Sequence, residues 1–386
     1  MGEATPKGVY PTLWDWVEQS RAGLFRDHEM QNVMYMEEAV RLTKPKGIKP
    51  PDHPAFENEA VTIPKAYVAV LPQGRYWVAE NKMAAVIAPD NKIVMDVSMQ
   101  YRRQDDAIHP VYKRSELPPA NSTGDTVALI NFIWDNNYYH WLGDVLGRLH
   151  LLERSGIRVD KYMVTGKGSP KYKSETLAML GVPEKKIVKS KPGMHLKPRR
   201  LVVPSLATYR LQPFVPHSMP KWASHYLRNA FLSQIGHVPA DSPKCIYISR
   251  KYAAVRKMTN EDDVSKLLGD IGFQEVVLES LPLAEQIKLF AGAELIVAPH
   301  GAGLANLMFC RPGTKVLELF APNYVHPVYW YLSNHIGLDY YYLFGEGERL
   351  PIMAGIGNCD CRTDNITVNM EQLFETVYEM KTGGLE

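Results

Sequence analysis

The chain has 386 residues, of which 45% are hydrophobic and 22% are charged. This is the composition of an ordinary globular protein, and it excludes a disordered or membrane-embedded chain. At roughly 150 residues per domain, the length predicts two or three domains, and two is the simplest arrangement. The 44 Lys and Arg residues against 42 Asp and Glu residues leave a formal net charge of +2. No global field therefore attracts nucleic acid or anionic lipid, and any anion site must be local.

The four cysteines are too few and too unevenly spaced for a disulfide framework or a zinc site of paired CxxC motifs. Reduced thiols are expected at Cys359 and Cys361. The N-terminus lacks the basic segment and long apolar core of a secretory signal, and no apolar run reaches 18 residues. These features predict a cytoplasmic protein without a transmembrane segment, with peripheral attachment to the inner membrane face as an alternative.

The order of predicted elements indicates an α/β protein. Proline clusters such as residues 44–54 separate short extended runs in the first 120 residues, which predicts loops around a few strands. From Thr126 onward, buried strands alternate with helices, and a second such series follows residues 211–220. We expect two Rossmann-like domains, residues 1–210 and 211–365, that face a cleft. Residues 366–386 predict a terminal helix that could pack back on the first domain.

In the first domain, NNYYHWLGDVLGRLHLL predicts a helix with an apolar stripe on one face. His140, Asp144 and Arg148 follow one another at intervals of four residues on the opposite face. An imidazole beside a carboxylate is a suitable general base, because the carboxylate orients the ring and supports its protonated form. From the spacing alone, the solvated face of an amphipathic helix is the more common explanation.

Two arginines are expected where a strand of the second domain ends. The strand KCIYISRK ends in Arg250, and Arg256 follows in the loop before the next helix. Guanidinium groups match phosphate oxygens in pairs, so the two side chains could neutralise a diphosphate leaving group without a metal ion. Glu279 and Glu318 end later strands and are expected at the same rim, where they could contact a ribose or a base. Simple solvation is the alternative for each carboxylate.

The strongest local signal is ELIVAPHGAGLANLMF, in which an apolar strand runs into His300, Gly301, Ala302 and Gly303 before a helix begins. Glycines let backbone N–H groups approach a ligand closely, and a helix N-terminus favours an anion. A phosphate fits this turn, although a tight β–α turn without a ligand accounts equally well for the glycines. Asn306 stands where the dinucleotide-binding fingerprint has its third glycine, which weakens an NAD interpretation.

Taken together, four segments of the chain resemble glycosyltransferase family 61 over about residues 126–345. They are NYYHWLGDVLGRL, ISRKYAAVRKMTNEDDV, GFQEVVLESLPLAEQIKLFAGAELIVAPHGAGLANLMF and RPGTKVLELF. The resemblance implies a GT-B fold, with the acceptor bound by the N-terminal domain and a nucleotide-sugar donor by the C-terminal domain. It implies an inverting hexosyl- or pentosyltransferase whose donor is commonly UDP-linked, as in bacterial enzymes of capsular or surface polysaccharide and glycoconjugate synthesis. Gly147 departs from the pattern, since many relatives have proline there.

The resemblance also implies roles for the residues singled out above. Arg250 and Arg256 would hold the diphosphate beside the turn from His300 to Gly303. Glu279 and Glu318 would contact the nucleoside, with Asn306 in the same donor site, while His140 or Asp144 would face the acceptor as the catalytic base.

The expected partners are a nucleotide sugar and a glycan or glycoconjugate acceptor, and no nucleic acid is expected. No metal or other cofactor is expected, because no Asp-x-Asp motif ends a strand. Two other functions stay open, a nucleotide-dependent dehydrogenase and a non-catalytic protein that binds nucleotide sugars. The sequence does not identify the sugar, the acceptor or the oligomeric state.

Overall fold

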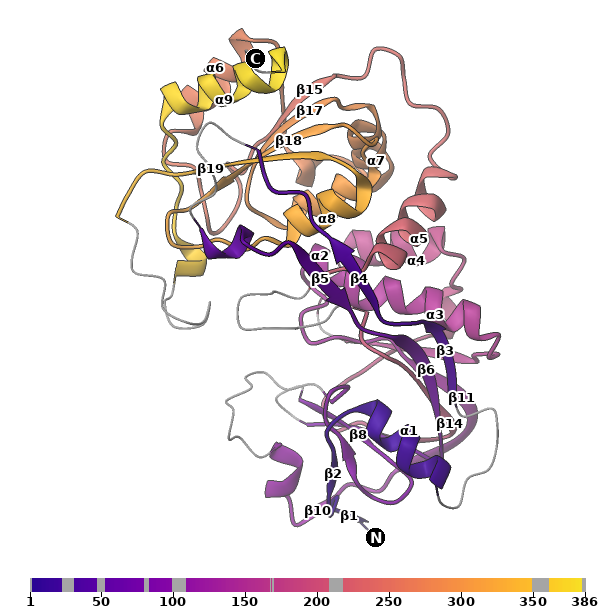
Figure 1. Cartoon of the computed structure of the whole chain (residues 1–386). Coiled ribbons are helices and arrows are strands. Elements are labelled where there is room, and N and C mark those ends of the chain that lie inside the picture. The colour runs from indigo at the N-terminus through magenta and orange to yellow at the C-terminus, as the bar shows by residue number, and fades with distance from the viewer. Residues whose placement is uncertain are drawn as a thin grey trace. The chain divides into compact units, whose positions relative to one another are not determined.

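The computed structural model describes residues 2–22, 31–46, 53–79, 83–98, 109–166, 168, 170–207, 218–348 and 361–383 (Figure 1). The chain divides into two units. Unit 1 comprises Met1–Glu38 and Pro64–Ala207, and unit 2 comprises Ala39–Ile63 and Thr208–Glu386. The division after Ala207 lies close to the expected boundary after residue 210, but an early segment, Ala39–Ile63, belongs to unit 2 and was not expected there.

Unit 1 is built on a mixed sheet that has ten strands in its described part, in the order β13-β12-β11-β14-β7-β8-β9-β2, with β6 paired to β14 and β3. The strands are β2 (Val9–Tyr10), β3 (Gln31–Tyr35), β6 (Ala66–Pro72), β7 (Arg75–Val78), β8 (Ala84–Ile87), β9 (Ile93–Val94), β11 (Asn121–Leu129), β12 (Lys161–Val164), β13 (Ile187–Lys189) and β14 (His195–Pro204). A separate pair joins β1 (Glu3–Ala4) to β10 (Glu116–Leu117). The helices are α1 (Leu13–Ala22), α2 (Tyr138–His140), α3 (Gly147–Ser155) and α4 (Lys171–Met179).

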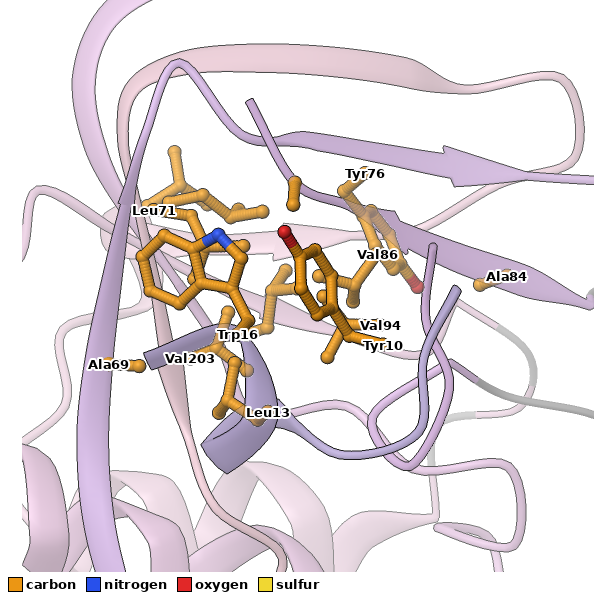
Figure 2. Packing of buried hydrophobic residues seen from close by; sticks show 14 of the residues in the cluster. Tyr10, Leu13, Trp16, Ala69, Leu71, Tyr76, Ala84, Val86, Val94 and Val203 are labelled. Atoms are coloured by element: carbon orange, nitrogen blue, oxygen red, sulfur yellow. The ribbon is translucent and has the colours of Figure 1, made fainter. Parts of the chain in front are cut away.

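One half of this sheet is parallel, and the other half is mainly antiparallel, with one parallel pair between β2 and β9. Strands β13, β12, β11 and β14 run parallel, as the alternation after Thr126 predicts, whereas β14 pairs antiparallel with β6 and β7. Helix α1 closes the core over the antiparallel half, where Leu13 and Trp16 pack among Leu71, Val86 and Val203 (Figure 2). The α/β class is confirmed, but unit 1 departs from a Rossmann-like domain because hairpins from the first 120 residues extend its sheet.

Unit 2 carries a parallel sheet of five strands in its described residues, in the order β16-β15-β17-β18-β19 (Figure 1). The strands are β15 (Cys245–Ile248), β16 (Gln274–Val276), β17 (Leu295–Pro299), β18 (Lys315–Phe320) and β19 (Asp339–Phe344). The helices are α5 (Lys221–Leu232), α6 (Glu261–Asp270), α7 (Leu283–Gly292), α8 (Val328–Ile336) and α9 (Met370–Thr382), with a 3₁₀ helix η7 (Ala302–Phe309) after β17. The chain reverses its direction of winding between β15 and β17, and such sheets bind ligands beyond the carboxyl ends of those two strands.

The segment Ala39–Ile63, here named the strap, is an integral part of unit 2. It enters through β4 (Glu38–Arg41) and leaves through β5 (Ala60–Ile63), which pair with each other. The backbone N–H of Lys46 donates to the Tyr340 carbonyl at 2.7 Å. Phe56 is fully buried and stacks on Tyr342 of β19 with ring centroids 4.6 Å apart. These contacts are distant in sequence, so local patterns do not reveal them.

The terminal helix α9 forms with the expected helical spacing of buried residues, Leu373, Val377 and Met380. These side chains pack with Val264 and Leu268 of α6 in the core of unit 2. The helix therefore packs within unit 2, and the expectation that it could pack back on the first domain is wrong.

No described helix has both the length and the apolar character needed to cross a bilayer. Cys245 and Cys310 are free, whereas Cys361 is disulfide-bonded. The expectation of a reduced thiol is therefore wrong for Cys361, and Cys359 lies outside the described residues.

The strap should contribute measurably to the stability of the protein. Phe56→Ala should lower the free energy of unfolding by about 3–5 kcal/mol, because it leaves a cavity among buried aromatic rings. Urea unfolding measures this change. Phe374→Ala is the matched control, since Phe374 also lies in unit 2 but is 44% exposed. Equal losses for the two variants would show that the strap is not part of the core.

Candidate functional site

The loop after β15 holds Arg250 in a fixed position at the carboxyl end of the strand. A single oxygen of Glu261, at the start of α6, accepts hydrogen bonds from the Arg250 backbone N–H at 2.9 Å, the Ser249 hydroxyl at 2.7 Å and the Tyr247 hydroxyl at 3.1 Å. The guanidinium of Arg250 donates to the Val255 carbonyl at 2.9 Å. Burial and the neighbouring charge of Arg256 lower the pKa of Arg250 below its usual value.

Arg256 lies in the same loop with an unusual backbone. Its φ of 54° is in the left-handed region, where a non-glycine residue costs of order 1–3 kcal/mol and tends to mark a functional site. The Nε of Arg256 donates to the His300 carbonyl at 3.3 Å, and its guanidinium lies 5.2 Å from the Tyr324 ring centroid. The structure therefore brings Arg256 and the glycine turn together, as the sequence predicts.

The turn after β17 presents open backbone donors. The N–H groups of Gly301, Ala302 and Gly303 donate to no described residue, because η7 starts here and its first amides have no partner within the helix. A Cβ at position 301 would overlap Nη1 of Arg250, so only glycine lets the guanidinium lie against this turn. Three open amides and two arginines thus converge at the carboxyl ends of β15 and β17, an arrangement suited to an anion.

His300 is fixed by a buried hydrogen-bonded chain. Its Nδ1 is 2.5 Å from Oε1 of Glu318, and the Tyr340 hydroxyl donates to Oε2 of Glu318 at 2.5 Å. Burial raises the pKa of Glu318 well above its usual value, while burial and the charges of Arg256 and Arg250 hold the pKa of His300 well below its own. Burial therefore favours the neutral form of both groups, and Nε2 is the His300 nitrogen that does not face Glu318.

Two residues predicted for the donor site are fully buried and bonded to other side chains of the protein. Glu318 is 0% exposed and both of its oxygens are engaged, so it does not reach a ribose hydroxyl. Asn306 is also 0% exposed and donates to Gln286 of α7 at 3.0 Å. Glu279 is exposed after β16 and interacts electrostatically with Arg250, which agrees with its predicted place at the rim.

Sequence reasoning missed the aromatic surroundings of His300. Phe320 stacks on the imidazole at 5.3 Å between centroids, and Tyr324 and Tyr329 each lie 5.4 Å away. Of these three rings, Tyr329 belongs to the aromatic run HPVYWYL at 326–332, but that run gave no indication of a partner.

In unit 1 the predicted pair is formed, with Nδ1 of His140 2.8 Å from Oδ2 of Asp144. The side chain of Asp144 is 0% exposed and that of His140 is 20% exposed. Arg148 is also buried and donates to the Asn131 and Pro204 carbonyls at the ends of β11 and β14. The solvated-face explanation is therefore wrong. A π-helical stretch, Trp141–Leu146, carries Asp144, and such stretches are frequent at functional sites.

Residues 138–317 match the family model Glycosyltransferase 61. The matched region includes the His140–Asp144 pair, both arginines and the turn from His300 to Gly303. This similarity supports the predicted family for this part of the chain.

Two similar proteins also carry glycosyltransferase names. The Beta-1,2-xylosyltransferase RCN11 of Oryza sativa subsp. japonica is 34% identical over 59 residues, which are 15% of this chain and 11% of that protein. The chain therefore matches only a small part of that relative's length. The solved structure of the dodecameric iron-containing heptosyltransferase TibC in complex with ADP-D-beta-D-heptose is 11% identical, with a TM-score of 0.32. That similarity covers 79% of this chain and 76% of that chain.

Glu318→Gln should change how stability depends on pH. The folded chain keeps a proton on Glu318 that the unfolded chain releases above its usual pKa of 4.5, so the stabilisation present below that pH is lost as pH rises. Relative to wild type, the variant should gain up to about 1.4 kcal/mol of stability per pH unit in the range from about pH 4.5 up to the raised pKa of Glu318. Urea unfolding of both proteins across this range measures the difference. Parallel pH profiles would contradict a neutral Glu318.

Proposed function

We propose that the protein is an inverting glycosyltransferase that uses a nucleotide sugar, UDP-linked in the simplest case. The acceptor would be a glycan or glycoconjugate of surface polysaccharide synthesis, and the enzyme would act in the cytoplasm or at the inner membrane face. The match of residues 138–317 to Glycosyltransferase 61 supports the reaction class. The observation that carries the donor assignment is the convergence of three open amides with Arg250 and Arg256.

The diphosphate of the donor would occupy this anion site. Arg250 and Arg256 repel each other in the absence of a counter-charge, so a bound diphosphate relieves the repulsion and accepts hydrogen bonds from the amides of residues 301–303. Neutral His300 would contribute its Nε2 side without adding charge. The same donors stabilise the negative charge that develops on the departing nucleotide, which is how such sites accelerate transfer.

In the proposed transfer, an acceptor hydroxyl oxygen attacks the anomeric carbon as the bond to the diphosphate oxygen breaks, so one displacement inverts the centre. His140 accepts the hydroxyl proton, and buried Asp144 orients the imidazole and stabilises its protonated form. The nucleotide leaves as the diphosphate anion. A GT-B fold is part of this proposal.

Arg256→Ala tests the donor assignment. Loss of one charged donor to the leaving group should slow sugar transfer by about 10²–10³-fold and weaken nucleotide binding. Initial rates of nucleotide release and calorimetric titration with the nucleotide measure the two effects. Lys251→Ala is the matched control, because Lys251 is an exposed cation of the same loop that pairs with Glu275. Unchanged kinetics in Arg256→Ala would remove Arg256 from the donor site.

Chelation tests the proposal that arginines replace a metal ion. Since the two guanidinium groups and the amides supply the positive charge for the diphosphate, excess EDTA should leave the transfer rate within about twofold of the untreated enzyme. Restoration by added Mn²⁺ or Mg²⁺ serves as the control. A strict requirement for either ion would contradict the proposal.

A further inference from the structure

The loop that follows β11 displays a large apolar side chain. Trp134 is 44% exposed, whereas the four core tryptophans are at most 2% exposed. These are Trp16, Trp77, Trp141 and Trp330. Exposing an indole is unfavourable in water, and Trp is the residue type most enriched where binding energy is concentrated. The exposed indole is therefore a candidate contact for a ligand.

The loop around Trp134 is rigidly built. The Trp134 carbonyl accepts from the Asn137 N–H at 2.8 Å, and the Phe132 carbonyl accepts from the Thr165 hydroxyl at 3.0 Å. Buried Asp135 pairs with Lys173 of α4 at 3.0 Å. These ties fix the backbone on both sides of the indole, so its exposure is a defined feature of the fold.

The indole lies directly beside the His140 imidazole. The two ring centroids are 5.3 Å apart with an interplanar angle of 42°. Phe132 lies 5.7 Å from Trp134 and 5.5 Å from His140, so the three rings form one aromatic cluster. Because the loop leaves the carboxyl end of β11 in the parallel half of the sheet, the cluster stands where α/β sheets bind ligands.

We propose that Trp134 is the platform for a sugar ring of the acceptor, with the ring packed through its C–H face on the exposed indole. A pyranose has an apolar C–H face and polar hydroxyl edges, so the indole removes the apolar face from water while a hydroxyl edge remains accessible to His140. The inference rests on the proposed function and deepens it by naming a residue and a ligand chemistry for the acceptor side. A nucleoside base could also stack on an indole, and the experiment separates the two ligands.

The test compares wild type, Trp134→Ala and Trp134→Phe in two reactions, with Tyr378→Ala as the control for an exposed aromatic residue elsewhere. The first is donor hydrolysis to water. The second is transfer to a panel of neutral methyl pyranosides and disaccharides, with separate KM values for donor and acceptor. Trp134→Ala should raise the acceptor KM about tenfold or more. Trp134→Phe should recover most of this loss, and in both variants the donor KM should stay within about twofold of wild type and the urea unfolding midpoint near that of wild type.

The contrary outcomes are distinct. An acceptor KM that is unchanged in Trp134→Ala overturns the platform, and so does a donor KM that rises as much as the acceptor KM, because the indole would then hold the nucleoside. A wild-type enzyme that hydrolyses the donor but neither binds nor glycosylates any saccharide of the panel overturns the platform and leaves the proposed function standing. A wild-type protein without donor turnover overturns the proposed function itself.

Discussion

The candidate donor site depends on one buried carboxyl group, that of Glu318 in the parallel strand β18. Glu318 has no exposed surface, so the fold must satisfy both of its oxygens within the protein. His300 and Tyr340 do so. The bond to His300 fixes the residue that follows β17 and opens the turn, and this sets the direction in which the next three amides point. The anion site is therefore positioned from the interior of the sheet.

The strap, which is distant in sequence, contacts the side chains and backbone that surround Glu318 and His300. Its Lys46 N–H binds the Tyr340 carbonyl, and its Phe56 ring lies 6.3 Å from Tyr340 and 6.1 Å from Phe320, which stacks on His300. The strap thus completes the packing behind the candidate donor site of unit 2. Neither unit is a continuous stretch of sequence, because the strap interrupts unit 1.

The sequence predicted the parts of the structure that local patterns encode. The parallel strands, the terminal helix, the two arginines beside the glycine turn and the His140–Asp144 pair all follow from periodicity and strand ends. The position of Glu318 did not, because β18 is buried on both faces and a strand of that kind has no alternation from which to read a direction. The burial of Asn306 was not predicted either, because the glycine motif does not identify its partner Gln286 on α7.

The remaining differences come from contacts between residues far apart in sequence. The strap can be assigned to unit 2 once the aromatic partners of Phe56 are known. The burial of Arg148, and of Asp144 beside it, depends on the carbonyls at the ends of β11 and β14. Likewise, no pattern distinguishes an exposed Trp134 from a buried one. The roles of these side chains depend on neighbours that the fold brings together, so they can be argued from the structure and not from local sequence.

The central claim is that the open amides and the two arginines bind the diphosphate of a sugar donor. Calorimetric titration of the purified protein with a panel of UDP-, GDP- and ADP-sugars, together with NAD, tests it most directly when free nucleotide release is recorded in parallel. The account predicts saturable binding of a nucleotide sugar and slow release of its nucleotide. Binding of NAD without binding of any nucleotide sugar would contradict it.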